Sequence, residues 1–166
     1  MTNQYFRAGA GTVLYREDGT IAIFQRANLP EVWQLQQGGC DHDETVEDTL
    51  WRELYEETAL TQAHITSVTP YPTWLPYPYP DAMRSQLRDP NCLGQIHRWY
   101  FLKLAPETVI DVTQAADKEF LACRFTTWTD LLAAQVPPHD IKKVVYQTLA
   151  NYFATTIMDT QTHRTA

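Results

Sequence analysis

The stretch from Gly38 to Leu60 constrains this chain more than any other feature of its sequence. Thr45, followed three residues later by Asp48, is typical of a helix start, because each side chain can cap the backbone N–H of the other residue. Apolar residues then recur every four positions, as one side of a helix requires; they are Val46, Leu50 and Leu54. The sequence therefore predicts a helix that begins after Thr45.

Three glutamates fall on a neighbouring side of this helix. At 3.6 residues per turn, Glu53, Glu56 and Glu57 lie within an arc of about 100°. Like charges at helix spacing repel by roughly 0.2–0.5 kcal/mol per pair, so stability alone does not favour this arrangement. A hard divalent cation with oxygen ligands would turn the repulsion into coordination. The alternative is a solvated acidic face, which is the usual meaning of a run of charges.

The order and spacing of these residues resemble the sequence box of the Nudix hydrolases. That pattern is Gly, five residues, Glu, seven residues, Arg-Glu, an aliphatic residue, any residue, Glu-Glu, any residue, Gly and an aliphatic residue. The matching residues are Gly38, Glu44, Arg52, Glu53, Leu54, Glu56, Glu57 and Leu60. Ala59 stands where the family has Gly. The resemblance implies an α/β fold, namely a Nudix-type α/β/α sandwich with a mixed sheet.

Further matches resemble one branch of the family, the bacterial RNA pyrophosphohydrolases and the asymmetric dinucleoside-polyphosphate hydrolases. Trp33–Gly39 is similar to Trp-Gln-Phe-Pro-Gln-Gly-Gly, with Gln36 in place of Pro. Trp74–Tyr77 is similar to Trp-Leu-Arg-Tyr, with Pro76 in place of Arg. The other matching segments are Cys92–Gln95, Glu119-Phe120 and Ile141–Tyr146.

The resemblance implies metal-assisted hydrolysis of a phosphoanhydride in a nucleoside 5′-polyphosphate, with release of pyrophosphate or a mononucleotide. The substrate is a dinucleoside polyphosphate or the 5′-triphosphate end of RNA. The expected cation is Mg²⁺, which Mn²⁺ can replace, and it neutralises charge and activates water. The implied ligands are Glu53, Glu56, Glu57 and Glu119, and Glu119 is alternatively the general base. Arg52 completes the catalytic set and is expected to pair with Glu44.

The implied substrate-binding residues are Arg7, Arg26, Tyr77, Lys142, Gly38 and Gly39. The two glycines are expected to allow a backbone conformation that other residues disfavour. Each of the three cations is equally consistent with plain surface. Two other functions stay open: a Nudix pyrophosphohydrolase of another nucleoside diphosphate derivative or nucleoside triphosphate, and a non-catalytic, nucleotide-sensing regulator.

Composition limits the remaining possibilities. With 166 residues the chain is long enough for one domain, so residues 1–166 are expected to form it, with flexible ends at about 1–4 and 157–166. A net charge of −7 opposes general binding of duplex nucleic acid. No apolar segment approaches the length of a membrane span, so a cytoplasmic location is expected. The three cysteines favour neither a disulfide framework nor a zinc site, and nothing predicts the oligomeric state.

The alternation of apolar and polar residues, together with the positions of Gly and Pro, predicts the other strands and helices. Strands are expected at 7–15, 21–25, 33–35, 65–71 and 95–104, with another inside 118–128. A short helix is expected at 129–134, and an amphipathic helix is expected after Pro137-Pro138. The segment Pro70–Pro90 holds six of the ten prolines. It is expected to form an extended loop, either a pinned surface loop or a lid whose aromatic rings, Tyr77 among them, stack on a base.

Overall fold

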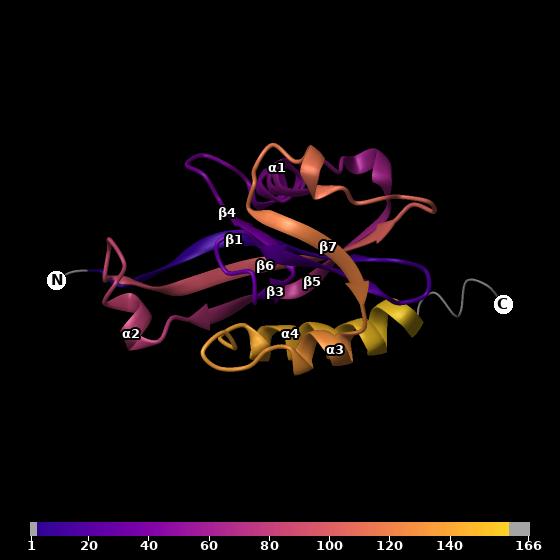
Figure 1. The fold of residues 1–166 in the computed structure, drawn as a ribbon. Coiled ribbons are helices and arrows are strands. Elements are labelled where there is room, and N and C mark those ends of the chain that lie inside the picture. Colours follow the sequence, from indigo (N-terminus) through magenta and orange to yellow (C-terminus); the bar gives the residue numbers. More distant parts are fainter. Residues whose placement is uncertain (1–2, 160–166) are drawn as a thin grey trace.

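A computed structural model describes residues 3–159 of the chain. A seven-stranded sheet forms the middle layer, with α1 on one face and α3 and α4 on the other (Figure 1). The strands are β1 (Tyr5–Tyr15), β2 (Ile21–Arg26), β3 (Trp33–Gln34), β4 (Gln36–Gly39), β5 (Ile65–Pro78), β6 (Cys92–Leu104) and β7 (Phe120–Thr126). The α-helices are α1 (Val46–Thr58), α2 (Asp81–Arg84), α3 (Trp128–Ala133) and α4 (Lys143–Tyr152). These layers confirm the predicted α/β/α sandwich.

The sheet is mixed, as predicted. Its main path runs β3-β2-β1-β6-β5, while β4 pairs with β1 and β7 pairs with β2. Strands β1 and β6 are parallel, and every other pair is antiparallel. Strand β1 pairs along one edge first with β4 and then, at Tyr15, with β2. The short strand β4 therefore lies beside the middle of β1, and the chain continues from it toward α1.

The core is divided between the two faces of the sheet. Successive residues of a strand point to opposite faces, so Trp99 packs toward α4 and Tyr100 packs toward α1. Leu50 and Leu54 of α1 are buried on the same side of the sheet as Tyr100. Tyr146 of α4 is buried on the other side, with Trp99. Helix α1 buries the apolar side that the sequence indicated, and α4 does so except for Val144, which is exposed.

Helix α1 begins as predicted. The Thr45 hydroxyl accepts from the backbone N–H of Asp48 at 3.1 Å, and the Asp48 carboxylate accepts from the Thr45 N–H at 3.3 Å. The helix ends at Ala59, whose φ of 60° and ψ of 10° are left-handed. The N–H of Ala59 donates to the carbonyl of Tyr55 at 2.8 Å. An alanine therefore occupies a conformation that favours glycine.

We expect Ala59→Gly to raise the free energy of unfolding by about 1 kcal/mol, because it removes the left-handed penalty of a Cβ atom. Urea unfolding of the two proteins measures the difference. Ala63→Gly, in the 3₁₀ turn Gln62–His64, is the matched control and should give no gain. A loss of stability in Ala59→Gly would contradict the left-handed helix end.

Part of the Pro70–Pro90 prediction is wrong. Instead of a loop, residues up to Pro78 continue β5, with a register shift between Pro70 and Trp74. The prolines are tolerated because β5 is an edge strand of the sheet, where one side needs no ladder partner. The chain then turns into the short helix α2.

The C-terminal helix confirms the predicted amphipathic segment and extends further than expected. After α4 the chain continues as a π-helical segment, Phe153–Ile157, and Ile157 is buried in the core. The predicted flexible end from about residue 157 stays a prediction. Residues 1–2 and 160–166 of the predicted flexible ends lie outside the described residues. Within residues 3–159, no helix is long and apolar enough to cross a bilayer.

Candidate active site

Most of the predicted site residues line one polar cavity of about 500 Å³. They come from both ends of the sequence, because β1, β2, β4, α1, the segment before β7 and the start of α4 meet there. The predicted residues that line it are Arg7, Arg26, Gly38, Gly39, Glu53, Glu57, Tyr77, Glu119 and Lys142. Arg52 and Glu56 are not among its lining residues.

The carboxylates of α1 pack directly against the backbone of β4. A Cβ atom at Gly38 would lie 1.9 Å from the carboxyl carbon of Glu53, so only glycine fits at this position. Glu119 reaches the same cavity because two backbone hydrogen bonds fix its segment. The N–H of Asp117 donates to the carbonyl of Glu56, and the N–H of Ala27 donates to that of Glu119, both at 2.8 Å.

Burial makes two carboxylates of this cavity, those of Glu53 and Glu57, costly to ionise. Burial, and next the charge of Glu119, raises the pKa of Glu57, whose side chain is 2% exposed. Burial also raises the pKa of Glu53, against the opposing hydrogen bond from Arg52. Crowded, desolvated carboxylates are the groups whose charge a bound cation would compensate.

Arg52 ties the loop before α1 to the helix. Its Nε donates to Oε1 of Glu44 at 2.7 Å, and its Nη2 donates to Oε2 of Glu44 at 2.8 Å and to the carbonyl of Gly39 at 3.0 Å. The Arg52 guanidinium lowers the pKa of Glu44 to about 2. The predicted pair of Arg52 and Glu44 is confirmed, and its position outside the cavity indicates a structural role.

Arg52 also contacts two of the predicted metal ligands. Its Nη1 donates to Oε1 of Glu53 and to Oε2 of Glu56, both at 2.9 Å. Within the part of the chain that the structure describes, no three acidic, histidine or cysteine side chains form a ready-made cluster for a metal ion. The structure thus brings Glu53, Glu57 and Glu119 to one cavity, while Glu53 and Glu56 are engaged by the guanidinium.

Positive charges come from other segments around the cavity. Lys142 Nζ donates to Oε1 of Gln34 at 2.9 Å, and Arg26 Nε donates to Oδ1 of Asn28 at 3.1 Å. Burial, and next the charge of Arg26, lowers the pKa of Lys142 to about 7. Arg7 approaches the backbone of Gly39, where a Cβ atom would lie 2.9 Å from its Nη2. The cavity therefore carries cationic and anionic groups together.

Tyr77 occupies a different place from the one predicted. It lies in β5, its side chain is 3% exposed, and its ring stacks on that of His97 with centroids 5.7 Å apart. The prediction that Tyr77 extends from a loop is wrong, since β5 continues through it. Its buried ring supports the cavity wall and leaves little surface on which a base could stack.

A hydrogen-bonded wall around Tyr77 was missed by the sequence analysis. Gln37 Nε2 donates to the Tyr77 hydroxyl at 2.7 Å, and that hydroxyl donates to Oε1 of Gln95 at 2.7 Å. Gln95 Nε2 donates to the hydroxyl of Tyr79 at 2.5 Å. Gln37 Oε1 is buried without a hydrogen-bond partner. The motifs containing Gln37 and Gln95 were visible in the sequence, but their convergence depends on strand pairing. Strands β4 and β6 both pair with β1, and β5 pairs with β6.

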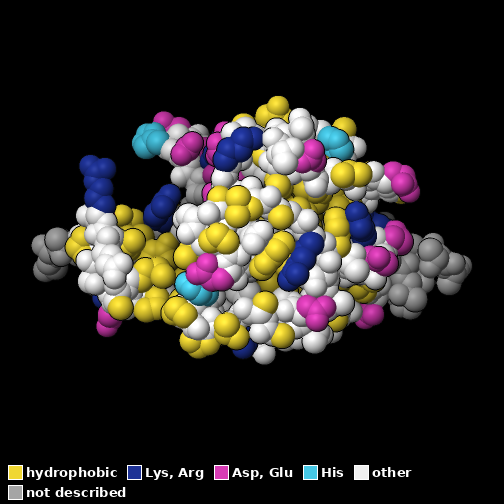
Figure 2. Space-filling view, viewed as in Figure 1, with side chains coloured by type: hydrophobic (Ala, Val, Ile, Leu, Met, Phe, Trp, Pro, Cys, Tyr) yellow, Lys and Arg dark blue, Asp and Glu magenta, His cyan; other side chains and the backbone are white. Residues whose placement is uncertain are grey.

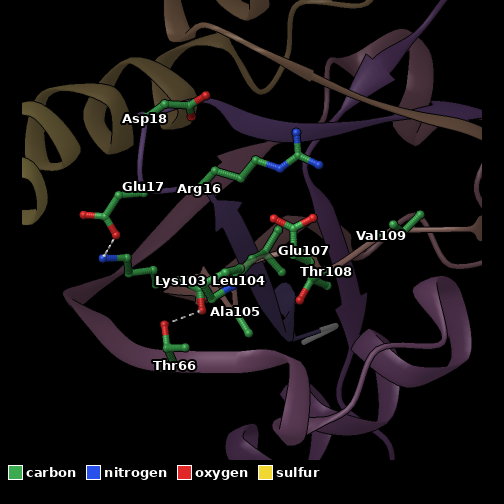
Figure 3. A pocket seen from close by; sticks show the side chains of 11 residues that line it. Arg16, Glu17, Asp18, Thr66, Lys103, Leu104, Ala105, Glu107, Thr108 and Val109 are labelled. Atoms are coloured by element: carbon green, nitrogen blue, oxygen red, sulfur yellow. Dashed lines mark hydrogen bonds and ion pairs between the residues drawn. The ribbon is translucent and has the colours of Figure 1, made fainter.

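A larger hollow of about 710 Å³ lies at the other end of the sheet (Figure 3). Glu17 pairs there with Lys103, and the Thr66 hydroxyl donates to the Lys103 carbonyl at 3.3 Å. Exposed residues of the β1–β2 turn, such as Arg16, line it, and none of the predicted site residues does. The cavity with the buried carboxylates is therefore the candidate active site.

Comparison with known proteins agrees with this geometry. The family model described as NUDIX domain matches residues 5–148. The chain belongs to the Nudix family. This Nudix chain is 32% identical over 158 residues to the RNA pyrophosphohydrolase of Shewanella sp. (strain MR-7), covering 95% of this chain and 88% of that one. The RNA pyrophosphohydrolase of Shewanella sediminis (strain HAW-EB3) is also 32% identical, with coverage of 95% and 90%.

Solved structures show the same fold at low sequence identity. The E. coli dihydroneopterin triphosphate pyrophosphohydrolase has a TM-score of 0.65 and 18% identity, covering 84% of this chain and 97% of that one. A C. elegans Ap4A hydrolase binary complex has a TM-score of 0.61 and 16% identity, with coverage of 88% and 98%. Together with the family match and the curated relatives, these findings identify a Nudix pyrophosphohydrolase.

Proposed function

We propose that this Nudix pyrophosphohydrolase hydrolyses a phosphoanhydride of a nucleoside 5′-polyphosphate with the help of Mg²⁺. The observation that carries the proposal is the cavity that Glu53, Glu57 and Glu119 line together with Arg26 and Lys142. Such a cavity suits a polyanionic substrate whose charge is neutralised partly by a cation and partly by side chains. The 5′-triphosphate end of RNA and dinucleoside polyphosphates both present this chemistry.

The residues fit a hard divalent cation. Glu53, Glu57 and Glu119 offer only carboxylate oxygens, which Mg²⁺ and Mn²⁺ prefer. Glu56 would join them after leaving Arg52, with which it shares a hydrogen bond. When bound, the cation neutralises the phosphates and activates water. Glu119 is either a fourth ligand or the general base, and its place at the cavity agrees with both roles.

The cationic side chains of the cavity orient the substrate. Arg7, Arg26 and Lys142 line the cavity and supply positive charge for phosphate oxygens. A net charge of −7 gives no long-range attraction for a polyanion, so these local cations and the metal carry phosphate recognition. The absence of a Cβ atom at Gly38 and Gly39 leaves room for Glu53 and Arg7, which line the same cavity.

Two features of the cavity suit a nucleoside. Gln37 lines the cavity, and its amide oxygen is an acceptor for which phosphates at neutral pH offer no donor, whereas a ribose hydroxyl or a base N–H does. A small niche of about 80 Å³ adjoins the cavity and shares Arg26, Gln34 and Lys142 with it. The apolar residues of this niche include Leu29, Val32 and Ile141. In this proposal the niche and Gln37 contact the nucleoside, and the cationic side chains contact the phosphates.

Figure 2 shows yellow side chains gathered at the lower left of this face, near α2, with blue and magenta side chains above them. Met83 of α2 is 38% exposed and lines both the cavity and the niche. The site thus combines an apolar border with a charged interior, as a nucleotide pocket needs.

A substrate panel tests the proposal. The wild-type protein would be incubated with Mg²⁺ and, separately, with 5′-triphosphate RNA, a dinucleoside tetraphosphate, a nucleoside triphosphate and a nucleoside diphosphate sugar. We expect the first two to give the highest kcat/KM, with products identified by mass. Efficient hydrolysis of only the sugar nucleotide or the plain triphosphate would overturn the substrate assignment. Binding without turnover of any substrate would instead support a nucleotide sensor.

A further inference from the structure

Gln36 stands where the resembling motif has proline, and its side chain is buried beside the carboxylates. It is 1% exposed and lies between two other buried residues, Thr12 of β1 and Glu57 of α1. Gln36 Nε2 donates to Oε2 of Glu57 at 2.8 Å. The Thr12 hydroxyl donates to Oε1 of Gln36 at 2.6 Å. These contacts form a continuous link from the sheet to the helix.

The direction of this link follows when Glu57 is ionised, as a cation ligand must be. An ionised carboxylate only accepts, so Gln36 presents its NH₂ group to Glu57. The amide oxygen then faces Thr12, whose hydroxyl acts as the donor. A proline at this position has no side-chain donor and could make neither bond. The link is therefore a property of this chain rather than of the motif it resembles.

The sheet holds the amide in place. Gln36 and Thr12 are directly opposite each other in the antiparallel pairing of β4 with β1. The next residue, Gln37, points to the other face, where it contacts Tyr77. Each glutamine of β4 thus contacts a different wall of the same cavity, and Gln36 contacts the carboxylate that is most deeply buried.

We propose that Gln36, braced by Thr12, is a positioning residue that holds Glu57 for a divalent cation. The inference rests on the proposed metal-dependent function. A hydrogen bond to one carboxylate oxygen fixes the rotation of the group and leaves its other lone pairs for the cation. Partners that orient metal ligands in this way typically change metal affinity by about 10- to 100-fold when they are removed.

The test is calorimetric titration of Mn²⁺ without substrate. Gln36→Met keeps the approximate length of the side chain but removes the donor, and we expect it to weaken Mn²⁺ affinity by about 10- to 100-fold. Thr12→Val should also weaken Mn²⁺ affinity, by a smaller factor. Thr12→Ser keeps the hydroxyl and should bind Mn²⁺ with the affinity of the wild type. Gln147→Met, on an exposed face of α4, is the matched control.

The outcomes separate this inference from the function on which it rests. If the wild type binds Mn²⁺ and both Gln36→Met and Thr12→Val bind it within twofold of that value, the positioning role is wrong and the proposed function stands. If the wild type itself binds no Mn²⁺, the metal-dependent function fails and the inference fails with it. Thermal unfolding of each variant shows whether it is folded. If Gln36→Met is unfolded, the Mn²⁺ affinity of Thr12→Val tests the positioning role instead.

Discussion

Glu57→Gln is expected to lower kcat by about 100-fold or more while the protein stays folded, because a metal ion contributes several kcal/mol to such a reaction. The substitution keeps the size of the side chain and removes its charge. Glu57 is buried and lines the cavity with Glu53 and Glu119. Steady-state kinetics at saturating Mg²⁺, with 5′-triphosphate RNA as substrate, measure the loss.

Two matched substitutions complete this experiment. Glu17→Gln, in the hollow at the other end of the sheet, should leave kcat unchanged. Glu56→Gln should also lower kcat strongly if Glu56 leaves Arg52 to bind the cation, as its place in the sequence box implies. Activity of Glu57→Gln close to that of the wild type would show that this carboxylate is not a ligand.

Arg52→Met is expected to lower the free energy of unfolding by about 3 kcal/mol at pH 7, because it leaves a largely buried carboxylate without its charged partner. The side chain of Glu44 is 13% exposed, and its carboxylate accepts two of the hydrogen bonds from Arg52. Denaturant unfolding measures the difference. Arg52→Lys keeps the charge but not the planar fork, so an intermediate loss is expected.

The pH dependence of this loss gives a second check. The pKa of Glu44 is lowered from 4.5 to about 2 in the folded protein, chiefly by Arg52. A group with a lowered folded pKa stabilises the protein above its unfolded pKa and loses that contribution as the pH falls through the folded pKa. The difference between the wild type and Arg52→Met should therefore narrow as the pH is lowered from 4.5 toward 2. A constant difference over that range would assign the stability to other contacts.

Local sequence signals predicted α1 well because they depend on short spacings. The capping pair, the apolar repeat and the glutamates are all set within one helix, so the periodicity of 3.6 residues determines which side each occupies. The left-handed end at Ala59 was not predicted, because the sequence shows only that alanine stands where the family motif has glycine. Glu119 was named through resemblance, but its place beside Glu57 depends on the backbone bonds of Asp117 and Ala27.

The errors concern position within the sheet. Prolines exclude a central strand, but no local signal shows that β5 lies at the edge, where they are tolerated. Tyr77 was therefore expected in a loop, whereas strand pairing buries it beside His97. Gln36 was noted only as a replacement for proline. Its contact with Glu57 depends on how β4 pairs with β1 and packs against α1, which sequence spacing does not specify.

Calorimetric titration of Mn²⁺ into the wild-type protein and into Glu57→Gln tests most directly whether the carboxylates of the cavity form a cation site. We expect saturable binding to the wild type and binding at least about 10-fold weaker to the variant, since one ligand loses its charge. Equal affinities in the two proteins, or no saturable binding to the wild type, would contradict a metal-dependent site in this cavity.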